Sequence, residues 1–114
     1  MIRAGNVVIV HLVSPTEKFW GVLERLDAVG LFLRGLNVSS FDDFLSQAAS
    51  GEPLTLGLAT MFVPMMRVER IFLDEQVGSV ESYCQRFERR VGVPITTFLD
   101  LDAGEDLEDL GQPS

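Results

Sequence analysis

The chain has 114 residues, of which 46% are hydrophobic, and its formal net charge at pH 7 is −8. A chain of this length forms one domain around one core, and no apolar run in it reaches the length of a membrane span. Residues 1–99 hold nine basic and eleven acidic residues, whereas residues 100–114 hold six acidic residues and no basic one. The nearly neutral body lacks the basic excess that is typical of nucleic-acid-binding proteins.

The chain offers little for catalysis or metal binding. Cys84 is the only cysteine and His11 is the only histidine. An intramolecular disulfide and a cysteine- or histidine-based metal cluster are therefore excluded, and a reducing cytoplasm is the expected location. No nucleophile–base pair or phosphate-binding glycine loop is visible, and carboxylates cluster only in the tail. We expect no catalytic residue, no cofactor and no metal.

Five segments have the β-branched, apolar character of strands, with turn residues between them. These segments are residues 6–13, 18–26, 31–36, 54–63 and 67–73. Gly21 interrupts the second segment, and we interpret it as the point where a curved sheet coils and a neighbouring strand approaches closely. In the fifth segment, strict alternation predicts Val68, Arg70 and Phe72 on one side and Glu69, Ile71 and Leu73 on the other.

Two helices are expected, at residues 40–50 and 79–91. In the first, Ser40 is a candidate cap, and the apolar stripe consists of Phe41, Phe44, Leu45 and Ala48. The second places Cys84 on its apolar stripe, which predicts a buried and inert thiol. Its arginines at positions 86, 89 and 90 favour a solvated face over a phosphate site, because Glu81 and Glu88 share the helix.

Five strands joined by tight turns and one helical excursion favour a small, strongly bent antiparallel barrel. The expected fold is therefore mainly β with two helices, with one domain at residues 1–99 and an acidic flexible tail at residues 100–114. The tail is interpreted as a solubilising end. The alternatives are that it folds back on a basic surface or binds a partner protein.

The stretch from Gly21 to Leu33 resembles the first signature of the Sm-like family, which includes the Sm proteins and the bacterial RNA chaperone Hfq. The matching residues are Gly21, Leu23, Leu26, Asp27 and Leu31 to Leu33. The second signature is matched by Val63, Val68 and Ile71, so the resemblance covers residues 6–73 apart from an insertion at 37–53. It implies an Sm-like or SH3-like barrel that assembles into a homo-oligomer, a ring in this family, and binds RNA. The chain departs from the family in having no helix before its first strand.

The resemblance also marks candidate binding positions. Family members stack a base on an aromatic residue after the aspartate, bind it with an asparagine and close the site with an Arg-Gly pair. Of these only Asp27 is retained, and the Lys-His pair of the Hfq site is absent. By position, the candidate RNA or ligand contacts are Asp27, Met65, Met66 and Arg67.

The last two strands mark a candidate subunit interface, because unpaired strand edges invite association. The candidate interface residues are Phe62, Val63, Val68, Ile71 and Phe72. The expected partners are therefore further copies of the chain, with RNA as the ligand of the family and no membrane. The alternative is a non-enzymatic protein-interaction or structural barrel without nucleic-acid activity, which the missing base-reading residues favour.

Overall fold

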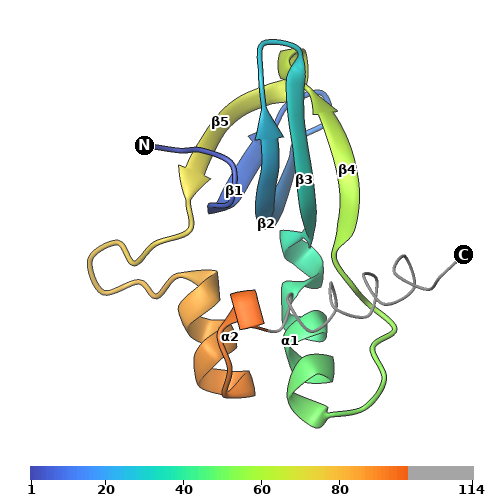
Figure 1. Cartoon of the computed structure of the whole chain (residues 1–114), viewed down its shortest axis with the longest axis vertical. Coiled ribbons are helices and arrows are strands. Elements are labelled where there is room, and N and C mark those ends of the chain that lie inside the picture. The colour runs from blue at the N-terminus through green and yellow to red at the C-terminus, as the bar shows by residue number, and fades with distance from the viewer. Residues whose placement is uncertain (98–114) are drawn as a thin grey trace, which may run out of the picture.

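The computed structural model describes residues 1–97, and the mainly β fold with helices is confirmed there (Figure 1). The five strands are β1 (Val7–Leu12), β2 (Glu17–Leu26), β3 (Gly30–Asn37), β4 (Ala59–Pro64) and β5 (Val68–Leu73). The helices include α1 (Phe41–Ser50) and α2 (Tyr83–Val91), and the short 3-10 turns include η1 (Val38–Ser40) and η2 (Met65–Arg67). The predicted tail at residues 100–114 lies outside the described residues.

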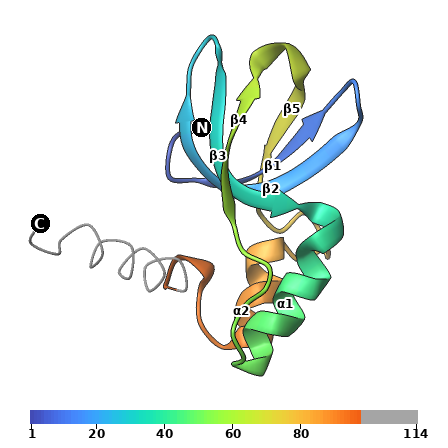
Figure 2. The same cartoon turned by 90° about the vertical axis from the view of Figure 1, so that its right-hand side faces the viewer.

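The strands form one antiparallel sheet in the order β4-β3-β2-β1-β5. Figure 2 shows how strongly this sheet bends and how the two helices gather beneath one end of it. Within residues 1–97, β4 pairs only with β3, and β5 pairs only with β1. The sheet is therefore not closed, and β4 and β5 are its two edges.

The interpretation of Gly21 is confirmed by its surroundings. Gly21 lies directly opposite Gly35 of β3. A Cβ atom added to Gly21 would meet the Arg34 carbonyl and, at 2.5 Å, the Gly35 Cα. Strands β2 and β3 therefore approach so closely at the Gly21–Gly35 pair that neither position has room for a side chain. Because these two positions lack side chains, the sheet can coil there.

The sheet has apolar cores on both faces. The inner face is formed by Val8, Val10, Leu12, Leu23, Leu31, Leu33 and Val63, all buried. On the outer face, Trp20 and Leu36 pack against the helical layer through Phe41, Phe44, Leu45, Phe87 and Ile95. The alternating burial of β1 follows from the period of two along the strand. The helices thus cover one end of the outer face.

The predicted fourth strand began too early. Residues 54–58 are not a strand, and β4 starts at Ala59. The side-chain Oε1 of Gln47 accepts hydrogen bonds from the backbone N–H groups of Thr55 and Leu56, at 2.8 and 3.2 Å. Because α1 satisfies these donors, the segment follows the helix instead of pairing with β3.

Two helix starts also differ from the prediction. Ser40 makes no side-chain cap hydrogen bond, and Asn37 instead accepts one from the Ser39 N–H at the start of η1. The second helix begins at Tyr83 rather than at residue 79. Its N-cap is Ser82, which forms a reciprocal capping box with Gln85.

Strict alternation in the fifth strand was wrong at Val68. Val68 packs against the inner core together with Ile71 and Leu73. The register between β1 and β5 shifts between His11 and Leu12, so one additional residue of β5 is accommodated there.

Candidate functional site

The turn after β2 and the 3-10 turn η2 meet at the end of the sheet opposite the helices (Figure 1). The backbone N–H of Met65 donates a hydrogen bond of 2.9 Å to the carbonyl of Val29. Met66 is 87% exposed and Val29 is 72% exposed. The structure therefore brings Asp27, Met65 and Met66 to one end of the molecule, where two apolar side chains face solvent.

Asp27 closes its own turn. Its carboxylate accepts hydrogen bonds from the backbone N–H groups of Val29 and Gly30, at 3.0 and 3.3 Å, and from Arg25 Nε at 3.1 Å. The hydrogen bond from Val29, with those from Gly30 and Arg25 and the charge of Arg25, lowers the pKa of this carboxyl below its usual value. Asp27, the residue that matches the Sm-like signature, thus stabilises the β2–β3 turn through its side chain.

Arg67 points to a different loop. Its Nε donates to the carbonyl of Val13 at 3.1 Å, and its Nη2 contacts the carbonyl of Pro15 at 2.8 Å and Glu17 Oε1 at 2.9 Å. These three contacts tie η2 to the β1–β2 connection. The hydrogen bonds of the Arg67 guanidinium are therefore made to the β1–β2 connection and to the start of β2, and not to the Asp27 turn.

The candidate interface residues divide between the two faces of the sheet. Val63 is buried in the inner core, and Val68 and Ile71 pack against that core. Phe62 and Phe72 face outward and are 44% and 43% exposed. Phe62 packs against Phe32 of β3 with ring centroids 5.1 Å apart, and Phe72 packs against His11 at 5.0 Å. Each sheet edge thus carries one exposed phenylalanine.

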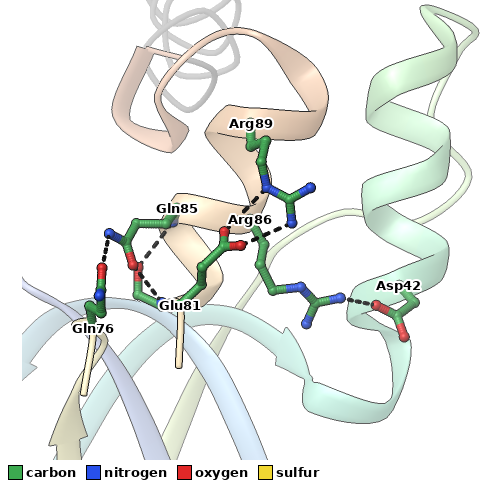
Figure 3. Close-up of polar contacts among 7 residues, drawn as sticks. Asp42, Gln76, Glu81, Gln85, Arg86 and Arg89 are labelled. Atoms are coloured by element: carbon green, nitrogen blue, oxygen red, sulfur yellow. Dashed lines mark hydrogen bonds and ion pairs between the residues drawn. The ribbon is translucent and has the colours of Figure 1, made fainter. Parts of the chain in front are cut away.

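Arg86 and Arg89 of α2 each pair with a carboxylate (Figure 3). Arg86 donates to Asp42 of α1 at 2.6 Å, and its guanidinium carbon lies 5.1 Å from the centre of the Phe41 ring. Arg89 pairs with Glu81 at 3.1 Å. An open pocket of about 400 Å³ is lined by Ser79, Val80, Glu81, Tyr83, Arg86 and Arg89. These pairings support the solvated-face interpretation, because the arginines join α1, α2 and the preceding loop.

A second pocket, of about 250 Å³, lies between β5 and the start of α2. Its apolar lining includes Ile9, Phe72, Val77, Val80 and Tyr83. Val77 and Val80 are each 69% exposed and pair through an isolated β-bridge. This pocket opens beside the β5 edge.

Asp74 is a structural residue that sequence reasoning missed. Its carboxylate accepts hydrogen bonds from Trp20 Nε1 at 3.0 Å and from the backbone N–H groups of Tyr83 and Cys84 at 2.8 Å each. An aspartate between a strand and a helix carries no signal that predicts a contact with a tryptophan 54 positions away. The predicted burial of Cys84 was only partly right, because the residue is half-buried. Desolvation, with the hydrogen bond and charge of Asp74, raises the pKa of its thiol, which favours an inert cysteine.

The described residues contain no cluster of three or more His, Cys, Asp or Glu side chains that could hold a metal ion. Among residues 1–97, no helix combines the length and the apolar character that crossing a bilayer requires. Comparisons with protein-family models, curated proteins and solved structures find no match to this chain.

Proposed function

We propose that this protein is a homo-oligomeric, Sm-like binding module whose subunits associate through β4 and β5. The observation that carries the proposal is that β4 and β5 each have one edge unpaired within residues 1–97, and each carries an exposed phenylalanine. Unpaired N–H and C=O groups at a strand edge are satisfied when another strand pairs with them. Because the two edges differ, the contact is heterologous, and it forms a ring when the rotation between subunits closes.

Three features support the Sm-like part of the proposal. First, the strand order places β1 beside β5. Second, the close approach of Gly21 and Gly35 lets β2 and β3 coil. Third, the turn that Asp27 closes comes directly after β2. Helix α1 lies in the insertion at residues 37–53, where the family has its variable loop. These features concern architecture and assembly, and they leave the ligand to be identified.

Sedimentation velocity of the full chain tests the assembly. We expect a species several times heavier than the 12.6 kDa chain at micromolar concentration. A single monomeric species under these conditions would overturn the proposal. Phe62→Ala is expected to shift the distribution toward the monomer, because it removes exposed apolar surface beside the β4 edge.

The ligand that the resemblance implies is RNA, but two observations favour a protein-interaction module without nucleic-acid activity. Asp27 shapes its own turn, and Arg67 is held by the β1–β2 connection. Binding to RNA oligonucleotides at two salt concentrations separates these functions, since phosphate contacts weaken steeply with salt. A protein lacking residues 100–114 is a second sample. RNA binding seen only after this deletion would identify the acidic tail as an inhibitor of the RNA-binding function.

A further inference from the structure

The connection between β5 and α2 swings out to the side of the sheet and presents a pair of exposed valines (Figure 1). Val77 and Val80 exchange backbone hydrogen bonds of 3.1 and 3.0 Å, and Gly78 between them has a φ of +59°, which favours glycine. Directly opposite residues of an antiparallel bridge carry their side chains on the same side. The two valines, each 69% exposed, therefore form one apolar pair on the surface.

The apolar pocket of about 250 Å³ adjoins this pair, because both valines belong to its lining. On the sheet side it is lined by Ile9 and by Phe72, which lie opposite each other in the register of β1 and β5. Pockets that hold cofactors and drug-sized ligands measure roughly 300–1,000 Å³. The smaller volume here suits one large apolar side chain.

The charged residues that line the pocket are all acidic, namely Asp74, Glu75 and Glu81. The donors to Asp74 from Trp20, Tyr83 and Cys84 are neutral N–H groups, so they do not neutralise its negative charge. Glu81 is paired with Arg89 at 3.1 Å, whereas Glu75 is exposed. The rim of the pocket therefore attracts a cation, and Glu75 is the carboxylate open to it.

Basic side chains begin one row further along the same face of the sheet. His11 lies two residues beyond Ile9, and its partners in the neighbouring strands are Lys18 and Arg70. A cationic group is repelled from that row and attracted by the carboxylates near α2. The charges thus give the pocket a direction, with its cation-binding side at Glu75.

The wall of the pocket toward α2 is held in place by hydrogen bonds within the chain. Asp74 accepts the Tyr83 N–H at 2.8 Å, and Ser82 forms the capping box with Gln85. Tyr83 and Ser82 both line the pocket. A site that is ordered before binding loses less conformational entropy when its ligand arrives.

We propose that this pocket and the Val77–Val80 pair bind a segment of another protein that carries a large apolar side chain next to a lysine or arginine. The apolar side chain fills the pocket, neighbouring apolar atoms rest on the valine pair, and the basic group pairs with Glu75. Like charge disfavours the acidic residues 100–114 and a nucleic-acid backbone as occupants. The site lies on the outer face of the sheet and does not require the β4–β5 contact of the proposed function.

Selection from a phage-displayed library of random heptapeptides on the immobilised full chain tests the chemistry of the occupant. We expect the enriched peptides to carry a net positive charge and at least one large apolar side chain. A synthetic copy of the most enriched peptide, titrated into the isotope-labelled protein, should cause its largest amide NMR shifts within residues 72–83. Enrichment of acidic peptides would identify residues 100–114 as the occupant instead. Neutral peptides, no enrichment, or shifts centred elsewhere would also overturn the proposal.

Variants separate the apolar and the charged contributions to the affinity of this peptide. The nearly isosteric double variant Val77→Thr/Val80→Thr should raise its dissociation constant about tenfold. Glu75→Gln should raise it about two- to fivefold, as expected for an exposed ion pair. The matched control is Glu52→Gln, at an exposed position of the α1–β4 connection, which should leave the constant within about 1.5-fold of the wild type. Equal constants for the two glutamate variants would overturn the role of Glu75.

Sedimentation velocity of the Val77→Thr/Val80→Thr protein separates this site from self-association. We expect the same distribution as for the wild type, and circular dichroism checks that the variant is folded. A shift toward the monomer would identify a second copy of the chain as the occupant and would overturn the proposal. A monomeric wild type would overturn the association through β4 and β5 alone, because peptide binding to the pocket is measured independently of it.

Discussion

The indole Nε1 of Trp20 donates a hydrogen bond to Asp74 Oδ2 over 3.0 Å, and this bond joins the sheet to the helical layer. Trp20 is fully buried, so its N–H needs a partner inside the protein. The same carboxylate accepts the N–H groups of Tyr83 and Cys84 at the start of α2, where helical donors lack partners. One side chain thus fixes β2, the end of β5 and α2 relative to one another.

Asp74→Ala should lower the free energy of unfolding by about 2–4 kcal/mol, because it leaves a buried indole N–H and two helix donors without their acceptor. Urea unfolding followed by the fluorescence of Trp20, the only tryptophan, measures this loss. The matched control is Glu75→Ala at the exposed neighbouring position, which should change stability by less than about 0.5 kcal/mol. A loss below about 1 kcal/mol for Asp74→Ala would contradict the assigned role.

The crossing of β2 and β3 gives a second prediction. Gly21→Ala and Gly35→Ala should each destabilise the protein by at least about 2 kcal/mol, because the new methyl group meets the backbone of the opposite strand. Gly57→Ala is the control, since no heavy atom lies within 4 Å of an added Cβ there. Thermal unfolding of the three variants checks the order, and equal melting temperatures would show that the strands separate without cost.

The sequence predicts the strands and the sharp bend because both depend on local pattern. Alternating apolar residues indicate strands, and a glycine in a strong strand indicates close backbone approach. The start of β4 is different, because residues 54–58 are kept from the sheet by the side chain of Gln47 in the preceding helix. The strand-like composition of residues 54–58 does not reveal that the Gln47 side chain, eight or nine residues earlier, accepts backbone hydrogen bonds that a strand would otherwise donate to β3.

The candidate site was predicted less well, because its contacts join distant positions. The turn containing Asp27 could be placed from sequence, whereas its contact with η2 is seen only in the structure. The contacts of Arg67 with Val13, Pro15 and Glu17 link positions 50 to 54 residues apart. Nothing local distinguishes such an arginine from one that is free to bind a ligand. The inward direction of Val68 depends on a shift in strand register that the residue pattern does not encode.

Arg67→Met tests whether this arginine is a structural clamp. The variant keeps much of the aliphatic length but loses three hydrogen bonds, so the free energy of unfolding should fall by about 1–3 kcal/mol. Arg70→Met is the control, because Arg70 is exposed and its ion pair is with its sequence neighbour Glu69. Chemical denaturation compares them. Equal stabilities for the two variants would show that the Arg67 contacts contribute nothing measurable.

His11 gives a prediction about pH. Burial lowers its pKa below the ordinary value of 6.5, the charges of Lys18 and Arg70 lower it further, and Glu69 acts in the opposite direction. Between the folded and the unfolded pKa, the unfolded chain therefore binds more protons than the folded protein. The stability associated with neutral His11 is fully present above about pH 6.5 and is lost as the pH falls through the folded pKa.

An NMR titration of His11, the only histidine, should accordingly give a midpoint below 6.5 in the folded protein. Urea unfolding at several pH values between about 7.5 and 5.5 should show stability decreasing toward the acid end. His11→Gln removes the titrating group and should flatten this slope, while carboxylates, which titrate at lower pH, are unaffected. A midpoint at or above 6.5, or an unchanged slope in His11→Gln, would show that the ring beside Phe72 does not disfavour the proton.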